Sequence, residues 1–140
     1  MATPSSVPLP LTGDSVIDAA THGYYWELDS SRSINWSLAD GYFGEVWSSP
    51  SNTAVILDSI FTNISSYANV QFNYVGDYAN PFDAYIGGSD ITVSPGGSGH
   101  FGTDTLTWAT GNFPDASLGA VDPGDIFLNI NSQANSLPSY

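Results

Sequence analysis

Apolar and polar residues alternate in the first third of the chain, which is the pattern of strands with one buried face. Within residues 33–38, Ile34, Trp36 and Leu38 fall on one face, and the residues between them are polar. Residues 24–28 are also rich in apolar side chains and precede a short polar turn. We therefore expect two strands, at 24–28 and at 33–38.

The apolar period changes to that of a helix between residues 50 and 68. Ser49 is a residue type that can cap a helix, and Pro50 suits the first helical turn. Apolar residues then recur three or four positions apart, which predicts a long amphipathic helix. The stripe consists of Val55, Ile56, Ile60, Ile64 and Tyr67, widened by Leu57, Phe61 and Ala68.

Alternation returns after the helix. Segments rich in glycine, proline and asparagine, such as 76–88 and 94–99, separate the alternating stretches and are expected to be loops. The alternating stretches themselves predict four further strands. These strands are expected at 70–74, 90–93, 106–110 and 125–131.

The order of these elements predicts an α+β fold with α/β-like character. We expect one mixed, mostly parallel sheet of about five strands, with one long helix packed on it. A chain of 140 residues suits a single hydrophobic core. Residues 1–13 contain several prolines and are expected to be a flexible tail, so residues 14–140 form the single domain.

The charge balance excludes several classes of partner. The chain has 14 acidic residues, a single basic residue, Arg32, and a net charge of −13. Nucleic acids and anionic membranes are excluded as partners, because phosphate contacts need Lys and Arg. Cysteine is absent, so no disulfide is expected, and no apolar run has transmembrane length.

Short motifs accompany the predicted elements in a definite order. The helix runs through Asn69-Val70 into a strand with Phe72, and the next strand begins Ser-Asp-Ile-Thr-Val at 89–93. Leu-Thr-Trp-Ala-Thr at 106–110 is followed by a Phe-Pro turn, and Gly-Asp-Ile-Phe-Leu-Asn occupies 124–129. This order, over roughly residues 12–140, resembles the N-terminal half of the catalytic domain in serralysin- and matrixin-like metzincin zinc metalloproteases.

The resemblance implies a fold of the metzincin upper-subdomain type and a secreted, extracellular bacterial zinc metalloendopeptidase. In such enzymes an edge strand pairs with an extended peptide or protein substrate through backbone hydrogen bonds, by strand addition. The backbone of Thr107, Trp108, Ala109 and Thr110 matches that strand. The side chain of Trp108 is expected to lie in the core.

The chain departs from the family because it lacks the zinc-binding motif H-E-x-x-H. Catalytic zinc needs three protein ligands and an open coordination position. The only histidines are His22 and His100, neither in such a motif, and we interpret both as loop residues. The resemblance places the missing helix after Tyr140. We therefore assign no catalytic residue, and expect zinc only when the C-terminal half is present.

A loop near the C-terminus offers candidate calcium ligands. Asp115, Asp122 and Asp125 lie among glycines and prolines, and carboxylate oxygens are ligands that calcium prefers. Matrixins place structural calcium in related loops. Ordinary turn chemistry, in which Asp and Gly serve the backbone, explains the same residues and is the preferred interpretation.

Three functions stay open at this point. The first is the N-terminal half of a zinc metalloendopeptidase domain, inactive by itself and partnered by a C-terminal half that carries the zinc helix. The second is a stand-alone, non-catalytic module that binds a peptide or protein. The third is an acidic, calcium-dependent extracellular structural protein.

Overall fold

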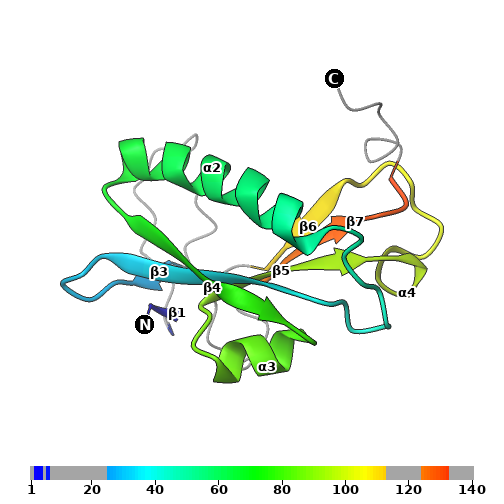
Figure 1. The fold of residues 1–140 in the computed structure, drawn as a ribbon, viewed down its shortest axis with the longest axis horizontal. Helices are drawn as coiled ribbons and strands as arrows, with labels where there is room; N and C mark the ends of the chain where they lie inside the picture. Colours follow the sequence, from blue (N-terminus) through cyan, green and yellow to red (C-terminus); the bar gives the residue numbers. More distant parts are fainter. Residues whose placement is uncertain (1, 5, 7–24, 113–123, 133–140) are drawn as a thin grey trace.

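The computed structural model describes residues 2–4, 6, 25–112 and 124–132. Within them a five-stranded mixed sheet has the order β4-β3-β5-β7-β6 (Figure 1). All neighbouring pairs are parallel except β6 with β7, which is antiparallel. The predicted α+β class, with a mixed, mostly parallel sheet of five strands and a long helix packed on it, is confirmed. The strands are β3 (Ser33–Ala39), β4 (Gln71–Tyr78), β5 (Ile91–Gly96), β6 (Ala109–Gly111) and β7 (Ile126–Asn129).

Strand β3 lies second in the sheet and carries much of the core. Ile34, Trp36 and Leu38 are buried on one face, as their alternation predicts. Ser37 points to the opposite face and is also fully buried. Both faces of β3 are covered because α2 and the short helix α3 (Pro81–Ile86) lie on opposite sides of the sheet (Figure 1).

Helix α2 (Pro50–Ala68) has the predicted bounds. Pro50 occupies the first turn, where its missing N–H leaves no hydrogen bond unmade. Ser49 is the N-cap residue, but its side chain accepts no capping hydrogen bond; its carbonyl instead accepts from the Thr53 hydroxyl. The helix ends at Asn69, which adopts a left-handed conformation with φ 47°.

Helix α2 packs on the sheet through a narrower face than its apolar stripe predicts. Ala54 and Phe61 are buried and Leu57 is half-buried. The Phe61 ring lies 4.9 Å from that of Trp36 and 4.7 Å from that of Phe72. Most of the predicted stripe instead faces outward, with exposed fractions of 42% to 84%. These exposed residues are Val55, Ile56, Ile60, Ile64 and Tyr67.

Two segments predicted as loops are partly ordered elements. Strand β4 continues to Tyr78, and helix α3 follows, with the Asn80 side chain accepting from the Asp83 N–H at 2.9 Å. Strand β5 extends through Pro95 to Gly96 and is buried along its length. The extension is paired with β7, which runs beside β5 from Val93 to Gly96, whereas β3 pairs with β5 only from Ile91 to Val93. A four-residue turn of helix, α4 (Ser98–Phe101), comes next.

The start of the chain is anchored in part. The sequence predicts residues 1–13 as a tail, but β1 (Thr3–Pro4) pairs antiparallel with β2 (Trp26–Glu27). Ala2 is buried, and its backbone N–H donates to the Asp90 carboxylate. Strand β2 is shorter than the predicted 24–28. The structure does not describe residues 7–24.

Candidate functional site

Strand β6 is the outermost strand at one end of the sheet, within the described residues. Two hydrogen bonds to and from β7 flank it. The Asn129 N–H donates to the Trp108 carbonyl at 2.8 Å, and the Asn112 N–H donates to the Asp125 carbonyl at 2.8 Å. These bonds fix which backbone groups of β6 face its neighbour.

The backbone of β6 alternates between its neighbour and the outer side of the sheet. In an antiparallel pair, residues that bond to the partner strand alternate with residues that do not. Because Trp108 and Asn112 bond to β7, Thr110 between them also faces β7. Ala109 and Gly111 therefore direct their N–H and C=O groups away from the sheet, toward the outer side of β6.

The four predicted substrate-pairing residues differ in the direction of their backbone groups. Trp108 and Thr110 face β7, whereas Ala109 faces outward. Thr107 precedes the strand; its carbonyl accepts from the Asn129 side-chain amide at 2.8 Å, and its N–H donates to Asp104 at 3.1 Å. Among the four predicted residues, Ala109 is the one whose backbone faces outward from within the strand. Gly111 shares this orientation and was missed, because the sequence does not reveal the register that sets backbone direction.

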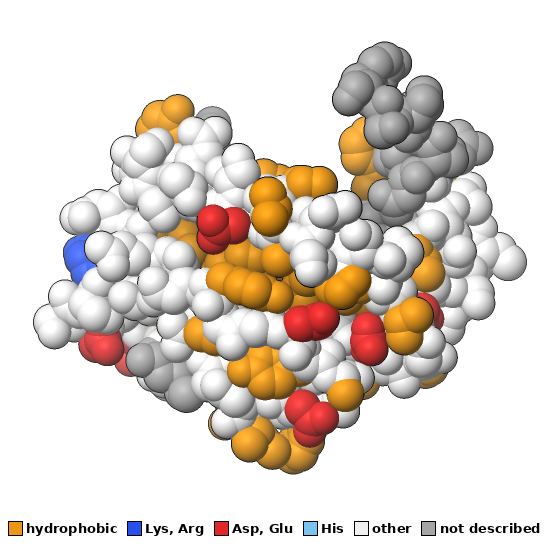
Figure 2. All heavy atoms as spheres, in the orientation of Figure 1, with side chains coloured by type: hydrophobic (Ala, Val, Ile, Leu, Met, Phe, Trp, Pro, Cys, Tyr) orange, Lys and Arg blue, Asp and Glu red, His pale blue; other side chains and the backbone are white. Residues whose placement is uncertain are grey.

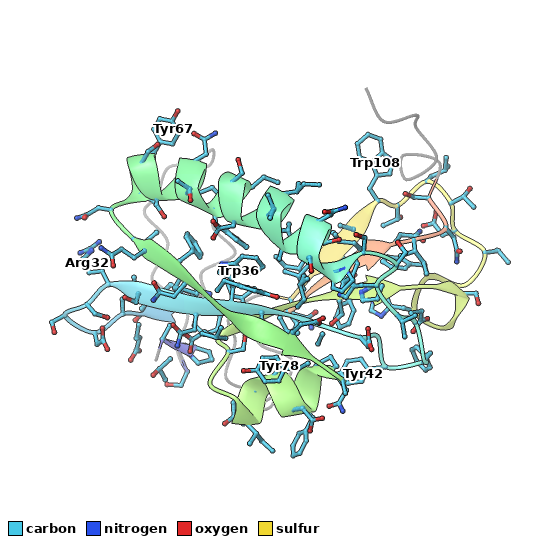
Figure 3. All side chains as sticks on the ribbon, in the orientation of Figure 1. Arg32, Trp36, Tyr42, Tyr67, Tyr78 and Trp108 are labelled. Atoms are coloured by element: carbon cyan, nitrogen blue, oxygen red, sulfur yellow. The ribbon has the colours of Figure 1, made fainter. Side chains whose placement is uncertain are left out.

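Two large apolar side chains flank β6 at the surface. Trp108 is 65% exposed and Leu106 is 77% exposed. The expectation that Trp108 lies in the core is wrong; its ring points away from the sheet (Figure 3). The segment that leads into β6 therefore exposes two large apolar side chains.

The loop that enters β6 is held by side-chain to backbone hydrogen bonds. The buried Asn129 amide donates to the carbonyls of Asp104 and Thr107, both at 2.8 Å. The Asp104 carboxylate accepts from the Thr107 hydroxyl and from the backbone N–H groups of Thr107 and Leu106, which lowers the pKa of Asp104. These hydrogen bonds fix the conformation of the loop that leads into β6.

His100 contacts β6 and β7 from helix α4. Its Nε2 lies 3.0 Å from the Thr110 hydroxyl, and its ring stacks on Phe127 with centroids 4.3 Å apart. Across the described part of the chain, no three His, Asp or Glu side chains gather closely enough to hold a metal ion. His100 thus supports the sheet edge, while His22 lies outside the described residues.

Of the three candidate calcium ligands, the structure describes Asp125. Asp115 and Asp122 lie outside the described residues. Asp125 is almost fully buried between β5 and β7, where its Oδ1 accepts from the Thr92 N–H at 3.1 Å. For Asp125 the structure shows a role in joining two strands.

Comparison with protein families, curated proteins and solved structures finds no match to this chain. None of the described helices combines the length and apolar character needed to cross a membrane. Function is therefore inferred from the fold and from the chemistry of the sites on its surface.

Proposed function

We propose that this chain is the N-terminal half of a secreted, extracellular bacterial zinc metalloendopeptidase catalytic domain of the metzincin type. In this domain the chain supplies the sheet and the edge strand β6, and an extended peptide or protein substrate pairs with β6 by strand addition. It is not active by itself. The observation that carries the proposal is the outward direction of the backbone groups of Ala109 and Gly111.

Strand addition needs free main-chain groups and room for a second backbone. An extended peptide can donate to and accept from the outward groups of Ala109 and Gly111, which continues the antiparallel ladder by one strand. Both residues are exposed, and neither carries a side chain larger than a methyl group. The exposed ring of Trp108 offers apolar contact to a substrate side chain beside this ladder.

The exposed apolar flank of α2 supports the second part of the proposal. At about 100° per residue, Ile56, Ile60, Ile64 and Tyr67 share one flank of the helix. An apolar surface of this kind commonly marks a contact with another protein segment. In the proposed complete domain, the zinc-bearing helix packs against this flank, where Tyr67 now points outward (Figure 3).

The described residues do not fit a catalytic zinc. The ion would polarise the scissile carbonyl and activate a water molecule, which requires three protein ligands. His100 is engaged with Thr110 and Phe127, and the described residues contain no group of three His, Asp or Glu side chains that could hold a metal ion. The ligands are therefore assigned to the C-terminal half, and this chain's residues hold the peptide extended.

Peptide binding to β6 is tested by removing one outward N–H. Ala109→Pro deletes the N–H that faces away from β7, and proline is tolerated at that side of an edge strand. We expect binding of fluorescein-labelled casein peptides, followed by anisotropy, to weaken at least about fivefold, the effect of one hydrogen bond. Ala109→Ser keeps the N–H and should bind within about twofold of the wild type.

The proposal fails if Ala109→Pro binds the peptides as the wild type does. It also fails if the folded wild-type chain does not bind them at all. Circular dichroism of each variant confirms that the fold is retained.

The same open edge also favours a second function, a non-catalytic module that binds peptides by strand addition. Such a module needs no zinc helix, so the apolar flank of α2 would stay uncovered. Peptide binding by β6 is common to both functions. They differ in whether the coding sequence continues into a zinc-binding motif.

A further inference from the structure

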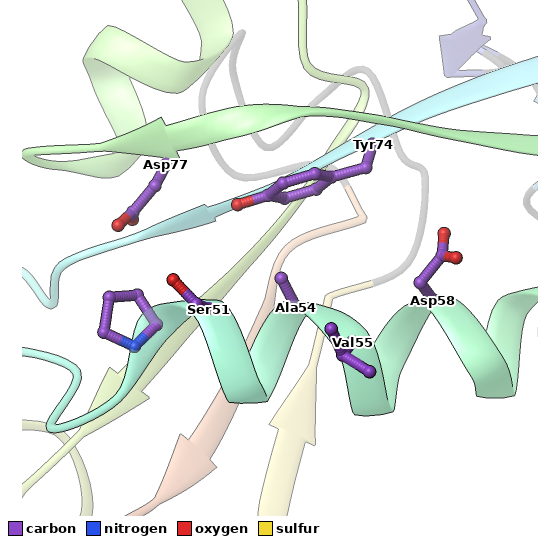
Figure 4. A pocket seen from close by; sticks show the side chains of 7 residues that line it. Ser51, Ala54, Val55, Asp58, Tyr74 and Asp77 are labelled. Carbon is purple, nitrogen blue, oxygen red and sulfur yellow. The ribbon is translucent and has the colours of Figure 1, made fainter.

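The two outer strands of the sheet are held in different ways. Strand β4 packs against α2, and a groove of about 470 Å³ between them is lined by Ala54 and Val55 from the helix and by Tyr74 from the strand (Figure 4). Apolar side chains gather in this hollow between helix and strand (Figure 2). The Tyr74 ring also packs on that of Trp36, with centroids 4.6 Å apart. Side-chain packing therefore holds β4 on the sheet.

Strand β6 has much less packing of this kind. It consists of the three residues Ala109–Gly111, and all three are exposed. Within the described residues, β7 is the strand that pairs with it. Packing of side chains against neighbouring strands is what stabilises a strand and fixes its register. A short, exposed strand with one neighbour therefore needs another device to fix its position along β7.

The position of β6 along β7 decides which backbone groups a peptide can reach. A slip of one residue would turn the groups of Trp108 and Thr110 outward and those of Ala109 and Gly111 toward β7. The outward edge would then be bordered by larger side chains. Peptide pairing thus depends on the residue at which β6 begins.

Asn129 fixes that starting point from the end of β7. It is the last residue of β7 and is fully buried. Its backbone N–H donates to the Trp108 carbonyl, and its Nδ2 donates to the Thr107 carbonyl, both at 2.8 Å. Successive carbonyls of a regular strand point to opposite sides, so a strand that included Thr107 would direct this carbonyl outward. The side chain of Asn129 holds it instead, and β6 begins after Thr107.

The orientation of the Asn129 amide is also fixed. Its Nδ2 donates a second hydrogen bond to the Asp104 carbonyl at 2.8 Å, and its Oδ1 accepts from the Asn131 N–H at 2.9 Å. A flipped amide would place Oδ1 against two carbonyl oxygens. Aspartate has the same shape but cannot supply both donors, so the site requires asparagine.

We propose that Asn129 is the positioning residue of the peptide-binding edge. Its side-chain amide sets the residue at which β6 begins, and so keeps the backbone groups of Ala109 and Gly111 directed outward. The consequence for peptides rests on the function proposed above. The position of β6 itself can be measured without a peptide.

The test is amide hydrogen exchange of the whole chain, followed by NMR. In Asn129→Ala, the N–H groups of Thr110 and Asn112, which face β7, should exchange at least about tenfold faster than in the wild type, the effect of losing the two side-chain hydrogen bonds. Asn129→Asp keeps the shape, loses at least one of these bonds, and should accelerate the same amides at least about threefold. In both variants the affinity for the casein peptides should fall at least about fivefold.

Asn35→Ala is the matched control. The Asn35 side chain also donates to a loop carbonyl, that of Gly88 at 3.1 Å, but it lies on β3. Its loss can lower overall stability, yet local opening of β6 should stay within about twofold of the wild type, as should peptide affinity.

The proposal is overturned if Thr110 and Asn112 exchange as in the wild type in both Asn129 variants, or if Asn35→Ala accelerates them equally. It is also overturned if the Asn129 variants bind a peptide as tightly as a wild type that binds it. A folded wild type that binds no peptide would contradict the proposed function, and the exchange rates would still decide the role of Asn129.

Discussion

Asp90 is a carboxylate buried immediately before β5, with an exposed fraction of 8%. Its Oδ2 accepts from the Asn35 N–H at 2.8 Å, and the Ala2 N–H also donates to it. Burial raises the pKa of Asp90, while these two hydrogen bonds oppose the change. Burial is the larger effect, so protonation of this carboxyl is more favourable in the folded state than in the unfolded state.

Asp90 therefore makes stability depend on pH in a defined direction. A folded-state pKa above the ordinary value of 3.8 means that this contribution is fully present below pH 3.8. It is lost as the pH rises through the folded-state pKa. We expect the free energy of unfolding of the wild type, relative to Asp90→Asn, to increase on going from neutral pH to below pH 3.8. Urea unfolding of both proteins measures this; a constant or decreasing difference would contradict it.

At the scale of elements, the features that could be predicted from the sequence are those that a local pattern of apolar residues encodes. The alternation in β3 and the bounds of α2 follow from the sequence, because each has a long and regular apolar period. Helix α3 does not, because six residues are too few to show a period. The face of α2 that meets the sheet also could not be predicted, since Ile60 is as apolar as Phe61.

The candidate site could also be predicted only in part from the sequence. The sequence pattern indicates a strand near Trp108, and the family resemblance implies that it is an edge strand. The outward direction of Ala109 and Gly111, however, depends on how β6 is registered against β7. Register is a property of two strands distant in sequence. The groove between α2 and β4 was not predicted either, because its two walls come from elements that meet only when the helix packs on the sheet.

The packing of α2 is tested by two aromatic residues of the same helix. Phe61→Ala should lower the free energy of unfolding by about 3 to 5 kcal/mol, because it removes a buried ring between Trp36 and Phe72. Tyr67→Ala should change it by no more than about 0.5 kcal/mol, because Tyr67 is 84% exposed. Urea unfolding measures both, and equal losses would show that α2 meets the sheet through another face.

At the scale of the whole molecule, charge is the dominant feature. With 14 acidic residues and one arginine, attraction between side chains cannot balance repulsion at neutral pH. The fold is therefore held by burial around Trp36 and by the backbone bonds of the sheet. Repulsion across the surface opposes both.

Salt should therefore stabilise the chain. The distance over which charges interact falls from about 30 Å at 0.01 M salt to about 3 Å at 1 M. We expect the melting temperature at neutral pH to rise by several degrees between these NaCl concentrations. Calorimetry measures it, with wild-type protein in equimolar sucrose and low salt as the control for general solute effects. A melting temperature that falls with NaCl would show that attractive pairs outweigh repulsion.

The proposal that this chain is half of a zinc metalloendopeptidase domain is tested most directly by sequencing the coding region downstream of the Tyr140 codon. We predict that the reading frame continues into a helix with H-E-x-x-H, followed by a third histidine and a methionine turn. A stop codon soon after Tyr140, or a long continuation without that motif, would contradict the proposal.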